Sequence, residues 1–393
     1  MKINSKYSAR VGSKTINIGL PNTEVTVKQK KHAFLFGCSE FSSVKYASGE
    51  MTGEEKPVAE ERYRLLAELM NFVTLPFYWG MFEPERGKPI TEKVKKAAEF
   101  YHSKGITLKG HPLCWHTVCA DWLMEMQNDE ILETQLRRIE RDVKEFAGLI
   151  DMWDVINEAV IMPVFDKYDN GVTRICKEYG TENLCKKLFS EARKTSPDAT
   201  LLINDFNTSE KYAELIERLL NDGAEIDAIG IQSHMHQGYW GVEKTEEVLD
   251  RFSRFELPLH FTETTLVSGP IMPPEIIDLN DYKNTEWLST PEGEERQAAE
   301  TILHYETLFA HPLVRSVTWW SFNDGLWLEA PSGLITKDSK PKPAYNELLK
   351  RVKGEWWLGE EKHVSNQDGE ITVTGCFGEY TAAFNGKEIN FTV

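Results

Sequence analysis

Strand-like and helix-like segments alternate along most of the chain, and this alternation is the feature that most constrains the fold. Short apolar runs predict eight strands, at 34–40, 71–77, 107–113, 149–158, 200–206, 228–235, 258–265 and 316–323. Helical patterns follow at 57–70, 91–103, 130–148, 173–195, 209–221, 243–254, 292–309 and 342–352. Eight such units predict an α/β fold, the (β/α)8 or TIM barrel. A doubly wound sheet is the alternative, but it usually has fewer strands and a glycine-rich loop after the first, which this sequence lacks.

The two ends of the chain carry a different pattern. Residues 14–30 read as two strands around a Pro-Asn turn, and residues 366–393 alternate apolar and polar side chains between glycine turns. Neither end is long enough to fold alone, so we predict that both pair into one small accessory β-sandwich beside the barrel. The predicted division is 1–32 and 353–393 for the accessory β-domain and 33–352 for the barrel. A structural cap is its favoured role, and sugar binding is the alternative.

Composition restricts the partners of the protein. The net charge of −17 argues against nucleic acid and anionic membrane, because both attract basic surfaces. We therefore expect a soluble protein that acts on a neutral ligand, and some of its 11 tryptophans are expected to stack on sugar rings. The N-terminus has no apolar signal segment, and no apolar run spans 18 residues. These observations predict a cytoplasmic protein, or a secreted one whose leader has been removed.

The cysteines and histidines predict no metal centre. Cys114 and Cys119 are five residues apart, and Cys176 and Cys185 are nine apart, so neither pair has metal-ligand spacing. We interpret all six cysteines as buried or free thiols. His111 and His116 also lie five apart in a strand-to-loop segment, unlike two histidines on one helix face. No metal or organic cofactor is expected.

Two glutamates end predicted strands. Glu158 closes the run WDVINE (153–158) at the end of the fourth strand, and Glu263 lies in HFTETT (260–265) near the end of the seventh. In a parallel barrel, the C-terminal ends of the strands present the reacting groups. Two carboxyls that converge there are the minimum equipment for cleaving a glycosidic bond, provided that one stays protonated and the other ionised.

Polar and aromatic side chains accompany the glutamates at neighbouring strand ends. Imidazoles and amides can donate to sugar hydroxyls, and indoles can stack on sugar rings. Of the adjacent tryptophans, we expect Trp320 to face the barrel lumen and Trp319 the layer between barrel and helices, because strand residues alternate in direction. The candidate binding residues at these strand ends are His111, Trp115, Asn157, Gln232, His234, Trp320 and Trp327.

Together these motifs resemble glycoside hydrolase family 10, the retaining endo-β-1,4-xylanases and their relatives on a (β/α)8 barrel. The resemblance covers roughly residues 33–350 and includes FEPERGK (82–88), INDFN (203–207) and KPAYNEL (342–348). It implies that Glu158 is the general acid/base and Glu263 the nucleophile, in a retaining reaction on xylan or xylo-oligosaccharides without a cofactor. It also implies a subsite on the non-reducing side of the cut bond, lined by His111, Trp115, Asn157, Gln232, His234 and Trp320.

One departure from the family pattern follows the second strand. The family usually has a Glu-Asn-x-Met-Lys run there, whose Glu, Asn and Lys hydrogen-bond the sugars one and two places from the cut. This chain has TLPFYWGMFEPERG (74–87), about two residues shorter, with Phe77, Tyr78 and Trp79 in place of those polar groups. Aromatic platforms tolerate varied hydroxyl patterns, whereas polar donors select one. We therefore add Tyr78 and Trp79 to the candidate binding residues and expect an altered cleft.

A second departure lies two residues after Glu263. The family often has Asp there, which orients the imidazole that corresponds to His234, whereas this chain has Thr265. A hydroxyl accepts the imidazole N–H without a negative charge, so His234 is expected to be cationic less readily. The expected consequence is a shifted pH optimum rather than a loss of catalysis.

Three other functions remain as alternatives. The same barrel suits a β-glycosidase of altered specificity, acting on a decorated hemicellulose, an aryl glycoside or a saponin. A non-catalytic sugar-binding barrel is less favoured, because binding alone needs neither glutamate. An isomerase or aldolase would carry a phosphate site or a lumen lysine in a motif near the chemistry, and Lys109 belongs to no such motif. Endo or exo action and the oligomeric state stay open at this stage.

Overall fold

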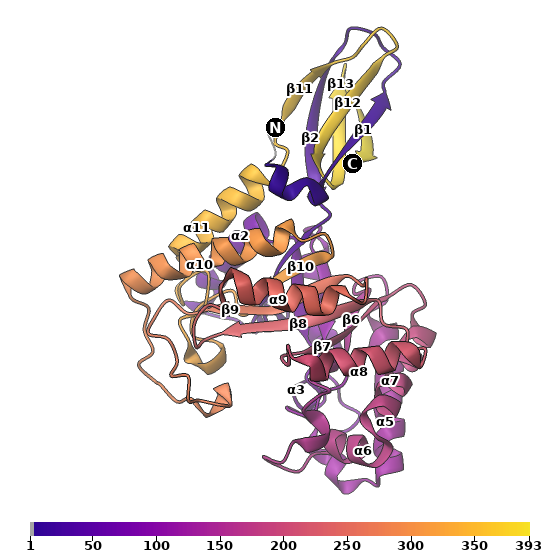
Figure 1. Ribbon diagram of the computed structural model, residues 1–393, viewed down its shortest axis with the longest axis vertical. Coiled ribbons are helices and arrows are strands. Elements are labelled where there is room, and N and C mark those ends of the chain that lie inside the picture. Colours follow the sequence, from indigo (N-terminus) through magenta and orange to yellow (C-terminus); the bar gives the residue numbers. More distant parts are fainter. Residues whose placement is uncertain (1–3) are drawn as a thin grey trace.

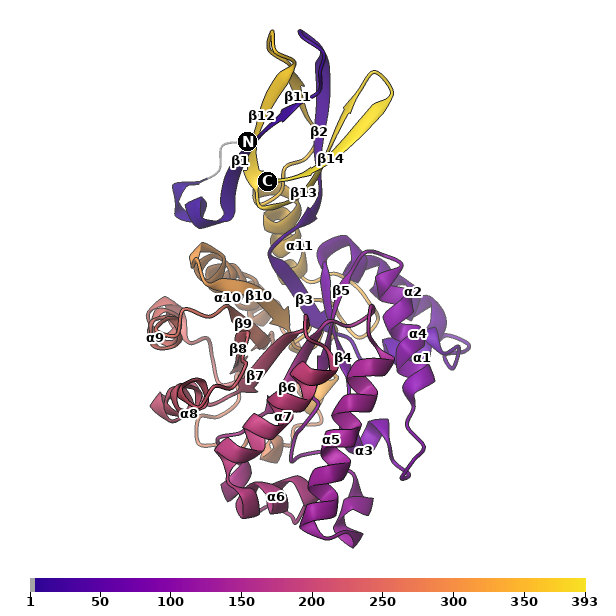
Figure 2. The same cartoon turned by 90° about the vertical axis from the view of Figure 1, so that its right-hand side faces the viewer.

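Eight parallel strands close into a barrel in the computed structural model, which describes residues 4–393. The barrel order is β10-β3-β4-β5-β6-β7-β8-β9, and helices surround it (Figure 2). This confirms the predicted (β/α)8 barrel. The strands are β3 (Leu35–Ser39), β4 (Phe72–Pro76), β5 (Thr107–His111), β6 (Met152–Asn157), β7 (Thr200–Asp205), β8 (Ala228–Met235), β9 (Leu259–Leu266) and β10 (Val314–Trp319).

The helices follow the predicted pattern with one clear difference. The segment 173–195, predicted as one helix, is two helices separated by Gly180, whose φ of 81° ends the first and opens the second. Two short helices, α1 and α3, were not predicted. The helices are α1 (Ser43–Ala47), α2 (Glu55–Leu69), α3 (Trp79–Phe82), α4 (Thr91–His102), α5 (Asn128–Glu145), α6 (Gly171–Tyr179), α7 (Thr181–Thr195), α8 (Glu210–Asn221), α9 (Gly241–Ser253), α10 (Pro291–Ala310) and α11 (Pro343–Lys350).

The two ends of the chain form small antiparallel sheets, as predicted. One sheet pairs β1 with β12, and the other has the order β11-β2-β13-β14. A shared apolar cluster contains Ile371 and Val373 from the first sheet and Val25, Val27 and Tyr380 from the second, so the sheets pack as a sandwich. The strands are β1 (Val11–Asn17), β2 (Glu24–His32), β11 (Glu361–Val364), β12 (Glu370–Cys376), β13 (Gly378–Phe384) and β14 (Lys387–Thr392). The domain division itself stays a prediction, and residues 1–3 of it lie outside the described residues.

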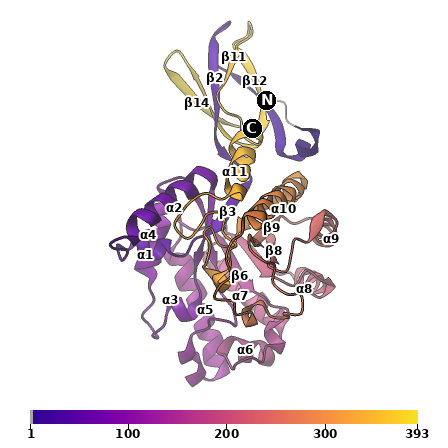
Figure 3. The same cartoon turned by 90° about the vertical axis from the view of Figure 1, so that its left-hand side faces the viewer.

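The accessory sheets lie at the N-terminal end of the barrel strands. Strand β2 ends at His32, and β3 begins only three residues later at Leu35. Figures 1 and 3 show both chain ends in these sheets and α11 leading into them from the barrel. Arg10, which precedes β1, donates to the carbonyl of Phe309 on α10 at 2.6 Å and fastens the sheets to the barrel. They are therefore far from the C-terminal strand ends, which we call the barrel mouth.

Two further predictions concern the cysteines and membrane-spanning segments. All six cysteines are free and five of them are buried, which confirms the expected thiols. Across residues 4–393, no helix combines the length and apolar character needed to cross a membrane.

Candidate active site

Glu158 follows β6 directly at the barrel mouth. Its backbone adopts a φ of 57°, which is uncommon for a residue with a side chain and typical of strained functional positions. The Glu158 amide donates to the carbonyl of Asn204 at 2.8 Å, which holds this turn against β7. One carboxyl oxygen accepts from Trp115 Nε1 at 2.8 Å, and the other from Gln232 Nε2 and Asn157 Nδ2, both at 3.3 Å.

The surroundings of Glu158 favour its protonated form. Burial, the negative charge of Asp205 and that of Glu263 together raise its pKa from 4.5 to about 8. Asp205 ends β7, is buried, and accepts backbone hydrogen bonds from Val160 at 3.0 Å and Asn207 at 2.9 Å. Burial also raises the pKa of Asp205, to about 7. Glu158 is thus a carboxyl group that stays protonated near neutral pH.

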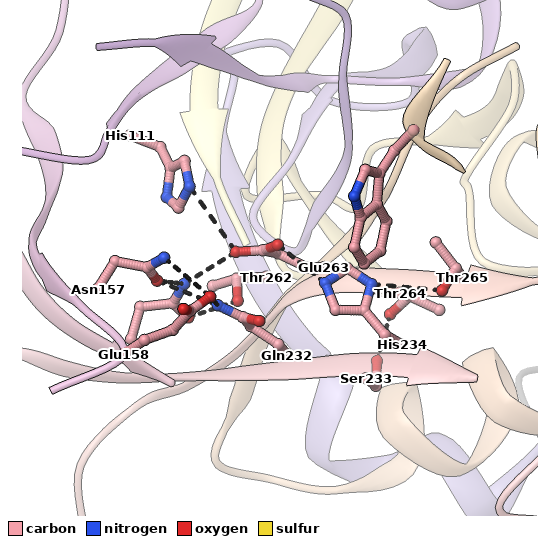
Figure 4. Close-up of polar contacts among 12 residues, drawn as sticks. His111, Asn157, Glu158, Gln232, Ser233, His234, Thr262, Glu263, Thr264 and Thr265 are labelled. Carbon is pink, nitrogen blue, oxygen red and sulfur yellow. Dashed lines mark hydrogen bonds and ion pairs between the residues drawn. The ribbon is translucent and has the colours of Figure 1, made fainter. Parts of the chain in front are cut away.

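Glu263 lies on β9 and faces three nitrogen atoms (Figure 4). Its Oε2 is 3.0 Å from His234 Nε2, while its Oε1 accepts from Asn204 Nδ2 at 3.0 Å and lies 3.8 Å from His111 Nε2. Burial works to raise the pKa of Glu263, but the hydrogen bond from His234 and the positive charges of nearby imidazoles and Lys109 outweigh it, so the pKa is lowered. The two glutamates therefore have pKa values displaced in opposite directions.

A network of side-chain amides connects the two glutamates. Asn157 Oδ1 accepts from Asn204 Nδ2 at 2.8 Å and from Gln232 Nε2 at 3.1 Å. Asn204 Oδ1 in turn accepts from Thr262 Oγ1 at 2.6 Å, next to Glu263 on β9. Asn204 therefore touches both the nucleophile candidate and the residue beside the acid candidate. It was not among the residues predicted from the sequence, although an amide directly after the apolar run of β7 (TLLIND) was an available signal.

A buried ion pair orients His111. Asp154 Oδ2 lies 2.6 Å from Lys109 Nζ and 2.7 Å from His111 Nδ1, and all three side chains are buried. Lys109 and His111 are two apart on β5, so both face the lumen. With Nδ1 held by Asp154, the other ring nitrogen of His111 points at Glu263 (Figure 4).

His234 is held in the way that its sequence context predicted. Its Nδ1 lies 3.3 Å from Thr265 Oγ1, while its Nε2 faces Glu263. The predicted binding residue Trp327 packs beside it, with ring centroids 4.6 Å apart and the ring planes tilted by 56°, and it donates from Nε1 to Asn280 Oδ1 at 3.1 Å. The hydroxyl of Thr265 therefore occupies the position at which a carboxylate would reinforce the imidazole.

Four rings form a closed set on the other half of the barrel mouth, and we call this set the aromatic wall (Phe41, Tyr78, His111 and Trp320). Successive centroids are 5.6 Å apart for Phe41 and Tyr78, 5.6 Å for Tyr78 and His111, 5.4 Å for His111 and Trp320, and 5.3 Å for Trp320 and Phe41. All four pairs meet edge to face. These residues lie at or just after the ends of β3, β4, β5 and β10.

The adjacent tryptophans divide as predicted. Trp320 joins the aromatic wall, while Trp319 is fully buried, donates to the carbonyl of Ser332 at 2.8 Å and packs beside Tyr305 of α10. Trp319 therefore belongs to the layer between barrel and helices.

The prediction that Trp79 is a sugar platform is wrong. Its side chain is 3% exposed and packs against Trp122 and the guanidinium of Arg138. Phe77 is also in the core, against Phe82 and Trp153. The chain leaves β4 and enters α3 here, so strand alternation ends and only Tyr78 of the three aromatic residues reaches the mouth.

Within residues 4–393, no cluster of three or more His, Cys, Asp or Glu side chains is arranged to hold an ion. The chemical groups that the described residues bring together at the mouth are the two carboxyls, their hydrogen-bond donors and the aromatic rings.

A (β/α)8 barrel with two carboxyls of opposed pKa at its mouth defines the class of glycosidase-like barrels. The family model Glycosyl hydrolase family 10 matches residues 41–351, and the chain belongs to this family. It is similar to endo-1,4-beta-xylanase B of Thermotoga neapolitana, with 28% identity over 287 residues, 68% of this chain and 75% of that enzyme. It is 23% identical to endo-1,4-beta-xylanase C of Paenibacillus barcinonensis over 392 residues, 84% of this chain, but spans only 35% of that protein.

Solved structures agree with the fold. Native xylanase 10B from Thermotoga maritima superposes with a TM-score of 0.64 at 20% identity, over 81% of this chain and 95% of that one. Xylanase 10B from Thermotoga petrophila RKU-1 in complex with xylobiose gives 0.63 at 22%, over 81% and 94%. At this level of identity the likeness concerns the barrel architecture.

Proposed function

We propose that this protein is a retaining glycoside hydrolase that cleaves β-1,4-xylosidic bonds in xylan or xylo-oligosaccharides. The observation that carries the proposal is the convergence of Glu158 and Glu263 at the barrel mouth through the amides of Asn157, Asn204 and Gln232. The surroundings of the two carboxyls displace their pKa values in opposite directions, raised for Glu158 and lowered for Glu263. One carboxyl is thereby ready to give a proton and the other to attack. The names of the similar xylanases support the substrate class.

In the first step, Glu263 attacks the anomeric carbon and forms a glycosyl ester. The bond to the leaving oxygen breaks, and Glu158 transfers its proton to that oxygen. The donors on Glu263, His234 and Asn204, keep its attacking oxygen in place. Trp115, bonded to Glu158 at 2.8 Å, holds the acid in position.

In the second step, Glu158, now ionised, takes a proton from water. The water oxygen attacks the anomeric carbon from the side of the departed group, and Glu263 leaves as a carboxylate. Two inversions give net retention, which requires the carboxyl groups to lie about 5–5.5 Å apart.

A β-glycosidase of altered specificity is the second candidate. The Tyr78 segment lacks the polar residues that the family resemblance places near the sugars. Exposed apolar side chains also lie on loops that follow barrel strands, among them Phe206 at 44% exposure after β7 and Ile271 at 49% after β9. Such side chains suit an apolar leaving group, as in an aryl glycoside or a saponin. A non-catalytic sugar-binding barrel is less favoured, since binding does not need opposed carboxyls.

A substrate panel with product stereochemistry tests the proposal. The protein is incubated with xylan, mixed-linkage glucan and aryl β-xylosides, and the first product is followed by proton NMR. We expect activity on xylosides with the β-anomer formed first. Initial formation of the α-anomer, or parent-like activity of Glu263→Ala, would contradict the retaining mechanism, while aryl glycoside activity without xylan activity would favour the second candidate.

Asp205 is expected to set the alkaline limit of activity. The negative charge of Asp205 raises the pKa of Glu158. In a plot of kcat/KM against pH, the fall on the alkaline side reports loss of the Glu158 proton. In Asp205→Asn that contribution disappears, so Glu158 loses its proton at lower pH and this alkaline limb moves down by about one unit. The control is Asp198→Asn, an exposed residue just before β7 at the opposite end of the barrel. Equal profiles for parent and Asp205→Asn would refute this role.

The substitution Thr265→Asp is expected to shift the acid side of the pH profile of kcat/KM to lower pH. A carboxylate beside His234 Nδ1 favours the imidazolium, which stabilises ionised Glu263. Glu263 then stays ionised to lower pH, so the acid limb of kcat/KM moves down by about one unit. Thr265→Asn, which has the shape of the Asp variant without its charge, should keep the parent limb. Superimposable profiles of the parent and Thr265→Asp would end this account of Thr265.

A further inference from the structure

Tyr78 stands where the chain departs from its family, and its ring is packed on several sides. It contacts Phe41, His111 and Trp115, with centroids 5.6, 5.6 and 5.4 Å away. His111 faces Glu263, and Trp115 donates to Glu158. One ring therefore separates Tyr78 from each carboxyl, that of His111 on the side of Glu263 and that of Trp115 on the side of Glu158.

We propose that Tyr78 and Phe41 close the cleft behind a single sugar on the non-reducing side of the cut bond. The enzyme would then remove sugar units one at a time from the non-reducing end of a chain. This inference rests on the proposed function and adds the direction of attack and the number of sugars held on that side.

The shape of the barrel mouth supports a closed end. Glu158 follows β6 and Glu263 lies on β9. Phe41, Tyr78 and Trp320 follow β3, β4 and β10, in the half of the barrel that contains the aromatic wall. Phe41 bridges Tyr78 to Trp320, so the wall has no gap between β4 and β10. A second sugar beyond the one between the carboxyls would have to occupy the space of these rings.

The hydroxyl of Tyr78 suits recognition of a chain end. Across the described residues 4–393, no hydrogen bond joins it to another side chain or to the backbone. Burial raises the pKa of Tyr78, and the negative charges of Glu263, Glu158 and Asp154 raise it further, so the hydroxyl stays protonated as a donor. A terminal sugar offers it a free hydroxyl, whereas an internal sugar is substituted on that side.

The segment that carries Tyr78 is held in place on both sides. The amide of Phe77 donates to the carbonyl of His111 at 2.7 Å, and that of Gly80 donates to the carbonyl of Val118 at 2.8 Å. A Cβ at Gly80 would lie only 2.7 Å from the carbonyl oxygen of Cys119, so the backbones are in close contact. With Phe77 and Trp79 buried in the core as well, the backbone that carries Tyr78 is held at this position of the mouth.

Two azasugars test the number of sugars held. The first is a xylose-like ring with nitrogen in place of the anomeric carbon, and the second carries an additional β-1,4-xylosyl unit at its non-reducing end. In calorimetry, the parent should bind the disaccharide azasugar no more tightly than the monosaccharide azasugar. The Tyr78→Ala variant should bind the disaccharide azasugar about tenfold more tightly than the parent does, a difference of about 1.4 kcal/mol in binding free energy. Met81→Ala, an exposed neighbour on α3, should behave as the parent.

Cleavage products give a second, independent readout. From xylohexaose labelled at its reducing end, the parent should first release xylose and labelled xylopentaose. First products from internal cuts, or a disaccharide azasugar that binds the parent at least tenfold more tightly, would overturn the closed end and leave the proposed function intact. Absence of both binding and cleavage would overturn the proposed function and this inference with it. If Tyr78→Ala does not fold, the parent results alone decide.

Discussion

Replacement of Glu263 by alanine is expected to lower kcat/KM by on the order of 10⁴-fold or more, the scale seen when an essential nucleophile is removed. No other described carboxylate receives donors from both His234 and Asn204 at the barrel mouth. The measurement uses an aryl β-xyloside, with circular dichroism to verify folding. The control is Glu256→Ala, an exposed residue just before β9 at the other end of the barrel.

Azide gives this variant a distinctive signature. In Glu263→Ala, a small anion can enter the space left by the carboxylate and attack the anomeric carbon from that side. Only one inversion then takes place, so the product is the α-glycosyl azide. A variant that keeps more than a tenth of the parent activity without azide would remove Glu263 from the nucleophile role.

Replacement of Glu158 by alanine is expected to make the rate depend steeply on the leaving group. General acid catalysis contributes roughly 10²–10⁴-fold, and a poor leaving group needs all of it. Activity on xylan should therefore fall by about 10³-fold, whereas formation of the glycosyl ester from a dinitrophenyl β-xyloside should stay within about tenfold of the parent. The second step slows because no base activates water, so a burst of dinitrophenol precedes a slow steady state.

Azide separates the acid/base role from a general structural defect. In Glu158→Ala it attacks the glycosyl ester directly and needs no base, so it should restore turnover and give the β-glycosyl azide. Equal losses on xylan and on the dinitrophenyl substrate, with no azide effect, would contradict the assignment.

The periodic parts of the fold were predictable because they depend on local patterns. Apolar runs marked the barrel strands to within a few residues, since strands buried on both faces have near-continuous apolar sequences. The same pattern located Glu158 and Glu263, because each lies at or beside the C-terminal end of such a run. The split of 173–195 was missed although Gly180 was a visible signal for a helix end.

The contacts of the site were less predictable because they depend on how distant strands align. Asn204 joins Asn157 to Glu263 only because β7 lies between β6 and β8 in a particular register. Trp79 was misplaced for a local reason, because Tyr78 and Trp79 were both read as replacements for the family's polar residues, whereas the turn from β4 into α3 buries Trp79. The direction of a side chain in a strand-to-helix turn follows from its backbone angles, which the residue type alone does not determine.

Trapping the glycosyl ester tests the central claim most directly. A dinitrophenyl β-xyloside with fluorine at C2 forms the ester rapidly but slows its hydrolysis, so the intermediate accumulates. Mass spectrometry of the intact protein and its peptides should show one fluoroxylosyl group, attached to Glu263. Label on another residue, or turnover with no labelled protein, would contradict a double displacement through Glu263.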